Sequence, residues 1–232
     1  MFAWDDGRVL RLARDPRRHG MIEREAAALA AAHEAGANVP GVHERVTVDG
    51  RPGVVLDRVD GVDLLSWLGS RPWSFRYVAR TLGTEHAALH QVEAPAALPA
   101  LHDDLRHRLG SPLVPADVRR RALERLERLP DGDRLLHGDF HPGNLLRTAD
   151  GCVVIDWTNG TRGDPAADVA RSILLAGDGI PRRILVSGYL RAYSRELPLD
   201  RERVDHWLPV WAAARLAEDI ESERGFLLDR AD

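Results

Sequence analysis

The chain contains no lysine, because all 32 of its basic residues are arginine. Lysine is normally among the commoner residues of globular proteins, and we attribute its absence to a GC-rich coding bias rather than to selection for guanidinium chemistry. The absence still matters chemically. Any site that would use a compact ammonium group must use the larger, planar guanidinium instead.

Cysteine and long apolar runs are also scarce. The single Cys152 excludes a disulfide within the chain and is typical of a reducing compartment. It lies in the apolar run Cys152–Ile155, so we interpret it as a packing residue rather than a nucleophile. No apolar stretch approaches the ~20 residues of a membrane span, and the N-terminal residues show no signal-peptide pattern. These absences predict a cytoplasmic protein with no membrane partner.

Length and charge narrow the class of protein further. A chain of 232 residues buries a sizeable core, as one large domain or two small lobes. The net charge of −4 gives no strong case for a nucleic-acid partner, which usually requires a basic patch. We therefore expect no nucleic-acid partner. The expected oligomeric state is a monomer or a homodimer.

Residues 1–58 show the signals of a small lobe that contains strands and one helix. The Asp-Gly pairs Asp6-Gly7 and Asp49-Gly50 predict two hairpin turns. Strands are expected on both sides of the first turn and at 42–48 and 53–56. An Ala- and Leu-rich stretch predicts a helix over 21–35, which Gly36 ends.

Residues 59–232 are predicted to be mainly helical, after a hinge at 58–61. Another Asp-Gly pair, Asp150-Gly151, predicts a hairpin over 145–156. The segment 95–115 is rich in Pro and Ala and yields no prediction. Helices are expected over 62–68, 75–91, 116–129, 166–176, 182–195 and 201–228, with a possible break of the last at Pro209.

The most informative stretch reads His137-Gly138-Asp139-Phe140-His141-Pro142-Gly143-Asn144 and is followed by Ile155-Asp156-Trp157. An aspartate, an asparagine five residues later and a second aspartate after the next strand form the pattern that kinases use for phosphoryl transfer. Asp139 would orient the attacking hydroxyl or accept its proton. Asn144 and Asp156 offer the oxygen ligands that Mg²⁺ prefers. They are predicted to meet at the open end of the hairpin.

A transition-metal site is the rival interpretation of this loop. His137, Asp139 and His141 alternate, so an extended strand would place all three on one face, as in a zinc hydrolase. Pro142-Gly143 interrupts such a strand, and this interpretation leaves Asn144 and Asp156 unexplained. We therefore favour phosphoryl transfer.

With these residues the chain resembles the aminoglycoside phosphotransferase family over nearly its whole length. The resemblance rests on four motifs: Arg24–Leu29, His137–Asn144, Ile155–Trp157 and Gly163–Asp168. It implies an α+β, two-lobed protein-kinase-like fold, with a nucleotide-binding N-lobe at 1–58 and a helical C-lobe at 59–232. It also implies transfer of the γ-phosphoryl of ATP or GTP, with Mg²⁺, to the hydroxyl of a small molecule.

Three further residues are expected to support the loop. His137 is predicted to anchor it through a ring hydrogen bond, whereas His141 either faces the phosphates or packs. Asp168 resembles the family aspartate that ties the catalytic loop from below. The alternative for Asp168 is a plain helix N-terminal charge, which the helix dipole favours.

Two departures from the family pattern keep a second hypothesis open. Arg11 stands where the family has a phosphate-binding lysine paired with a helix glutamate, here Glu25 by position. A nucleotide-binding role and a solvated strand residue are both compatible with Arg11. Met1 also begins too late for a first strand and phosphate-covering loop, so we expect an upstream start or an incomplete lid. The alternative function is a catalytically impaired kinase-like protein that binds or senses a ligand.

The acceptor site is the least determined part of the sequence. Acidic residues near the C-terminus would suit a cationic acceptor, with tryptophans as pocket walls. The competing interpretation is a solvated helix face and core aromatic residues. The residues concerned are Glu218, Asp219, Glu221 and Glu223, and Trp157, Trp207 and Trp211.

Overall fold

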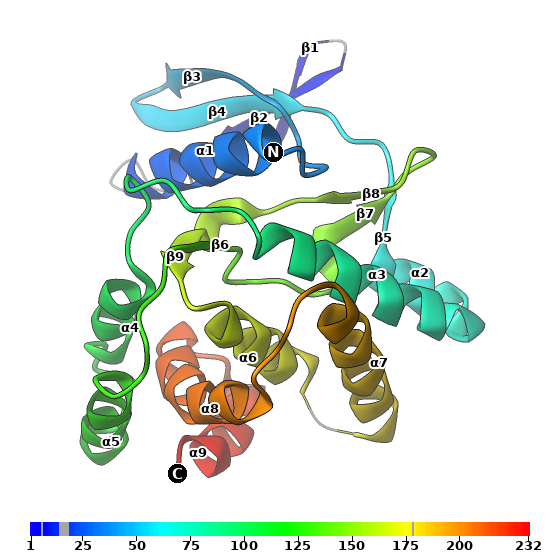
Figure 1. Ribbon diagram of the computed structural model, residues 1–232. Coiled ribbons are helices and arrows are strands. Elements are labelled where there is room, and N and C mark those ends of the chain that lie inside the picture. The colour runs from blue at the N-terminus through cyan, green and yellow to red at the C-terminus, as the bar shows by residue number, and fades with distance from the viewer. Residues whose placement is uncertain (6, 14–18, 178) are drawn as a thin grey trace.

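Residues 2–57 of the computed structural model form a four-stranded antiparallel sheet with one helix against it (Figure 1). The structure describes residues 1–5, 7–13, 19–177 and 179–232. The strand order is β1-β2-β4-β3, and all three pairings are antiparallel. The elements are β1 (Phe2–Asp5), β2 (Arg8–Leu12), α1 (His19–Glu34), β3 (Val42–Val48) and β4 (Arg51–Asp57).

The sequence signals explain this sheet. Asp49 and Gly50 both have positive φ, 51° and 72°, as a tight two-residue hairpin turn requires. Central strand β4 buries Val54 and Val55 completely, and the small, apolar face of α1 packs in the same core. The predicted order of two strands, a helix and two strands is therefore confirmed. Asp6, in the other predicted turn, lies outside the described residues.

Helices make up most of the rest of the chain, as expected (Figure 1). The division into residues 1–58 and 59–232 stays a prediction. Within the described residues, no helix is both long and apolar enough to cross a membrane. The helices are α2 (Leu64–Ser70), α3 (Phe75–Leu89), α4 (Leu101–Leu109), α5 (Ala116–Leu126), α6 (Pro165–Ala176), α7 (Ile180–Glu196), α8 (Arg201–Arg215) and α9 (Arg224–Ala231).

Short strands hold the segments that carry the motifs. β5 (Val62–Asp63), β7 (Leu145–Arg147) and β8 (Cys152–Val154) form one antiparallel sheet, and β6 (Arg134–Leu136) pairs with β9 (Thr161–Gly163). The β7–β8 pair is the predicted hairpin. The loop 137–144 therefore runs from β6 to β7, and Asp156 follows β8.

Helices α3 and α7 pack closely at Gly83 and at Gly188. A Cβ on Gly83 would lie 2.5 Å from the Ala192 Cβ, so only glycine permits this approach. The close packing brings two buried histidines, one on α3 and one at its C-terminal cap, against a pair of tyrosines on α7.

Two element predictions need correction, and one segment without a prediction contains a helix. The helix expected from residue 62 begins at Leu64, because Val62 pairs with Arg147 and Asp63 caps the helix. Helix α8 continues through Pro209 to Arg215, since its buried face, including Trp211, offsets the lost hydrogen bond. The interruption comes at Asp219, with φ of 57°. The segment 95–115 contains α4, which buries three leucines on one face.

Candidate active site

The loop 137–144 enters the site through a sharp turn at Gly138. Its φ is +75°, and a Cβ there would lie 2.5 Å from the Asn159 carbonyl oxygen. Any larger residue would therefore displace the loop from the segment that follows Asp156. Glycine is required here by backbone geometry.

Asp168 on α6 holds the start of the loop. Its carboxylate accepts hydrogen bonds from the backbone N–H groups of His137, at 2.6 Å, and Gly138, at 3.0 Å. The imidazole Nε2 atoms of His86 and His90 lie 3.1 and 3.4 Å from Asp168 Oδ2. Burial disfavours the charged form, but the bonds to His86 and His90 hold the pKa of Asp168 well below its usual range. This buried carboxylate is therefore ionised.

The two histidines that contact Asp168 were not predicted from the sequence. His86 Nδ1 lies 2.7 Å from the Tyr189 hydroxyl, and His90 Nδ1 lies 2.7 Å from the Tyr193 hydroxyl. Burial lowers the pKa of His86 to about 3, so this ring is neutral and donates from Nε2 while Nδ1 accepts from tyrosine. The available signal was a His pair and a Tyr pair, each at a spacing of four residues on a helix.

The group His86, His90 and Asp168 also has the spacing of a metal site, because its ligand atoms lie within 4.8 Å of one another. Each imidazole nitrogen already faces a hydrogen-bond partner, and Asp168 accepts from four donors. Such complete satisfaction is what buried polar groups require. We interpret the group as a hydrogen-bond network that supports the loop.

Asp139 lies at the centre of the candidate site. Its carboxylate oxygens lie 3.5 Å from Arg171 Nη2 and 3.7 Å from His141 Nε2. Burial raises the pKa of a carboxyl, but His141 and the Arg171 guanidinium outweigh it and lower the pKa of Asp139 to about 2. Asp139 is therefore a half-buried anion at neutral pH.

Asn144 and Asp156 lie near each other through the β7–β8 hairpin. The Asn144 amide nitrogen donates to the Asp139 carbonyl oxygen at 2.9 Å, and the Ile155 N–H donates to the Asn144 carbonyl at 2.9 Å. Asp156 follows directly, in a left-handed conformation with φ of 64°, and its side chain is 39% exposed. Its exposed carboxylate and the nearby amide form an oxygen donor set that fits Mg²⁺ with water and phosphate as further ligands.

The rings of His137 and His141 have different surroundings. His137 is fully buried, and its Nε2 lies 2.9 Å from the Ile155 carbonyl oxygen while its Nδ1 accepts from the Asp139 N–H. His141 instead accepts from the Gly143 N–H and lines a cavity beside the loop. His137 is therefore fixed to the segment before Asp156, and His141 lies at the cavity wall. The roles of both residues stay predictions.

Arg11 joins the sheet to the site. Its Nε lies 2.9 Å from Glu25 Oε2, although this contact is not aligned as a hydrogen bond. Its Nη2 donates to Asp156 Oδ1 at 2.9 Å. Burial raises the pKa of Glu25 to about 7, against the lowering effect of the guanidinium. Arg11 is thus held by two acids and is not a freely solvated strand residue.

Like His86 and His90, Arg171 is a site residue that the sequence did not predict. It is 2% exposed, and it contacts the Gly138 carbonyl oxygen through Nε and Glu218 through Nη2 at 2.8 Å. Its Nη1 has no hydrogen-bond partner in the part of the chain that the structure describes. It follows Asp168 by three residues, within one helical turn, so one stretch of α6 contacts both the loop backbone and the Asp139 carboxylate.

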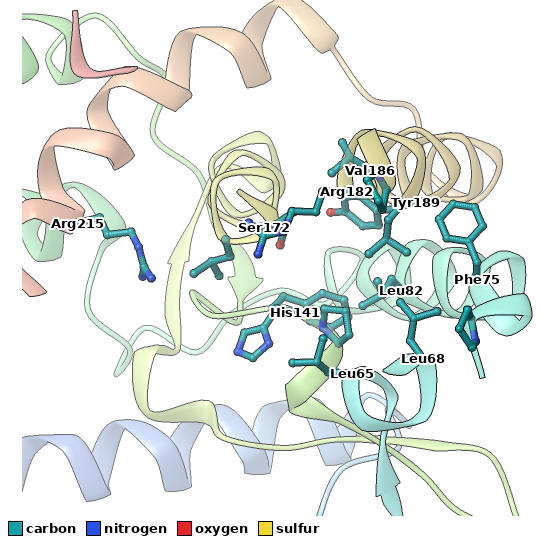
Figure 2. A pocket seen from close by; sticks show the side chains of 17 residues that line it. Leu65, Leu68, Phe75, Leu82, His141, Ser172, Arg182, Val186, Tyr189 and Arg215 are labelled. Carbon is teal, nitrogen blue, oxygen red and sulfur yellow. The ribbon is translucent and has the colours of Figure 1, made fainter. Parts of the chain in front are cut away.

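A cavity of about 540 Å³ opens beside the loop, between α2, α3, α6 and α7 (Figure 2). Phe140, His141 and Pro142 form the wall nearest to Asp139, and apolar side chains form most of the rest. The three tryptophans considered as pocket walls do not line the cavity, because all of them are buried in the core. They are Trp157, Trp207 and Trp211.

Two of the acidic residues considered for a cationic acceptor are already paired with arginine. Glu218 binds Arg171 at 2.8 Å and Arg215 at 2.7 Å, and both oxygens of Glu223 bind the Arg215 guanidinium. These two residues are therefore not free carboxylates. Asp219 and Glu221 line a separate small depression at the end of α8.

The comparisons with known proteins agree with this geometry. A sequence model of the phosphotransferase enzyme family matches residues 2–207. No curated protein sequence matches the chain. Among solved structures, an aminoglycoside-3'-phosphotransferase of type VIII is similar, with a TM-score of 0.66, 21% identity and coverage of 91% of this chain and 84% of that one.

Two further structures share the fold. The amicoumacin kinase hAmiN, in complex with AMP-PNP, Ca²⁺ and Ami, has a TM-score of 0.65 and 16% identity, and the match covers 96% of this chain and 79% of that one. APH(3'')-Id from Streptomyces rimosus, in complex with ADP and streptomycin, has a TM-score of 0.63 and 16% identity, with 91% and 86% coverage. The two-lobed kinase-like fold is confirmed, and the chain belongs to the phosphotransferase enzyme family that its motifs predicted.

Proposed function

We propose that the chain transfers the γ-phosphoryl group of ATP or GTP, with Mg²⁺, to the hydroxyl group of a small molecule. The observation that carries the proposal is the position of Asp139, an ionised carboxylate beside Asn144 and next to a cavity of ligand size. The nucleotide complexes among the structural neighbours support a nucleotide as the donor.

In this proposal Asp139 orients the acceptor hydroxyl and receives its proton as the O–P bond forms. In a loose phosphoryl-transfer transition state most catalysis is positioning and electrostatic stabilisation, so a fixed carboxylate is sufficient. Arg171 and His141 restrict where this carboxylate points. Asn144 and Asp156 would hold Mg²⁺, which supplies charge neutralisation on the transferring phosphates.

Arg11 is proposed to contact the nucleotide phosphates from the sheet side, with Glu25 as its anchor. The contact between Arg11 and Asp156 also supports the second candidate function, an impaired protein that binds a ligand without turnover. Arg11 Nη2 already occupies Asp156 Oδ1, one of the candidate metal ligands. An arginine that stays there would compete with the cation for this oxygen.

The function is tested by label transfer from [γ-³²P]ATP and [γ-³²P]GTP to a panel of hydroxyl compounds, with Mg²⁺ or with EDTA. The panel contains uncharged macrolactones, monoamines, sugars and polycationic aminoglycosides. We expect a labelled small molecule with Mg²⁺ and none with EDTA. Nucleotide binding without any labelled product across the panel would favour the impaired candidate.

A further inference from the structure

The cavity beside the catalytic loop has an apolar lining. Of the seventeen side chains that surround it, most are aliphatic or proline, with Phe75 and Phe140 as the aromatic contributors (Figure 2). The polar ones are His141, Ser172, Arg182, Tyr189 and Arg215. No aspartate or glutamate lines the cavity among the residues that the structure describes.

Glu218 and Glu223, the carboxylates that contact Arg215 on the cavity wall, are paired with arginine and are not free for a cationic ligand. Arg215, on the cavity wall, is held by both oxygens of Glu223 and by Glu218. Glu218 also binds the buried Arg171, which in turn faces Asp139. In these contacts each acid is matched by a guanidinium. Breaking such pairs to bind a ligand ammonium would leave the buried guanidinium groups of Arg171 and Arg215 without a partner.

Among the described residues that line the cavity, the charge without an ion-pair partner is positive, whereas the Asp139 carboxylate lies just beyond the lining, 3.7 Å from His141 Nε2. Arg182 lies on α7 at the wall, exposed, and none of the described carboxylates forms an ion pair with it. Figure 2 shows Arg182 and Ser172 on the side opposite Leu65 and His141. A ligand with several ammonium groups would lose hydration in an apolar cavity and also meet a cation.

Resting on the proposed function, we propose that the acceptor is a hydroxyl compound with a largely apolar body and no cluster of positive charge. The apolar walls would bind the body of this compound, and its hydroxyl would lie at the His141 end, next to Asp139. The volume of about 540 Å³ suits a molecule of drug size. Polycations such as streptomycin, which a structural neighbour binds, are a poor match for these walls.

The test is calorimetric binding to the full chain without nucleotide, so the result does not depend on turnover. The probes are erythronolide B, an uncharged hydroxylated macrolactone, and streptomycin, a polycation. We expect erythronolide B to bind at least about tenfold more tightly than streptomycin. In Leu65→Asp, which places a carboxylate at the apolar wall, we expect this preference to fall by about tenfold or more.

Leu65 suits this test because it is 57% exposed and lies in the first turn of α2, where an acidic residue is compatible with the helix dipole. The matched control is Ile184→Asp, which is 52% exposed on α7 outside this cavity and should leave the preference unchanged. Tighter binding of streptomycin, no binding of erythronolide B, or equal effects of the two variants would overturn the proposal. Failure of label transfer alone would instead count against the phosphotransferase function.

Discussion

Replacing Asp139 by asparagine is expected to lower the rate of phosphoryl transfer by about 10²–10⁴-fold, the usual contribution of a positioned acid or base. The amide retains the shape of the side chain but cannot accept the hydroxyl proton. It also loses the charge that Arg171 and His141 contact. Asn144 Nδ2 also donates to Asp139 Oδ2 at 3.3 Å, and because the oxygen of an asparagine amide can still accept this bond, the affinity for Mg²⁺-nucleotide should stay within a few fold. The rate is measured by label transfer and the affinity by calorimetry.

Asp133→Asn is the control for this experiment, since that carboxylate is 65% exposed and lies before the loop. It should leave both quantities unchanged. Normal transfer by Asp139→Asn would remove Asp139 from the reaction. A parallel loss of nucleotide affinity would indicate instead a collapse of the loop.

Replacing Asp168 by asparagine is expected to lower the free energy of unfolding by about 3 kcal/mol or more, because at least two buried donors lose their acceptor at about 1–3 kcal/mol each. The carboxylate accepts from two backbone N–H groups and two imidazoles. An amide offers one oxygen and adds two donors of its own. Chemical denaturation followed by circular dichroism measures the difference.

The matched control is Asp103→Asn on α4, where the side chain is 74% exposed in a surface ion pair. Such pairs contribute about 0–1 kcal/mol, so this variant should be nearly neutral. If Asp168→Asn and Asp103→Asn have the same stability, the buried network does not hold the loop.

Local signals in the sequence predicted much of the fold and the central residues of the site. Asp49-Gly50 specified a hairpin because few other residue pairs accept two positive φ angles. Asn144 and Asp156 were predicted to meet at the open end of a hairpin. The β7–β8 hairpin is confirmed, and the residue before Asp156 donates to the Asn144 carbonyl oxygen. The roles of these two residues and of Asp139 in metal binding and catalysis stay predictions.

Tertiary contacts account for what the sequence did not predict. His86 and His90 meet Tyr189 and Tyr193 because α3 and α7 approach closely at Gly83, across 103 residues of chain. Both imidazoles also contact Asp168 on α6, which no local pattern shows. Arg171 reads as an ordinary surface arginine in an arginine-rich chain, yet it is buried against Asp139. The pairing of Glu218 with arginine likewise depends on how α8 ends, which no local pattern shows.

The measurement that tests the central claim most directly is a thermal-shift titration with Mg²⁺-ATP and Mg²⁺-GTP on wild type, Asp156→Asn and Asp150→Asn. A ligand at 100 times its Kd stabilises the folded state by about 2.7 kcal/mol, or about 5–10 °C for a chain of this size. We predict this rise in wild type and in Asp150→Asn, whose carboxylate lies at the exposed hairpin turn, and its loss in Asp156→Asn. An unchanged melting temperature in wild type with both nucleotides, or an equal rise in Asp156→Asn, would contradict the nucleotide site.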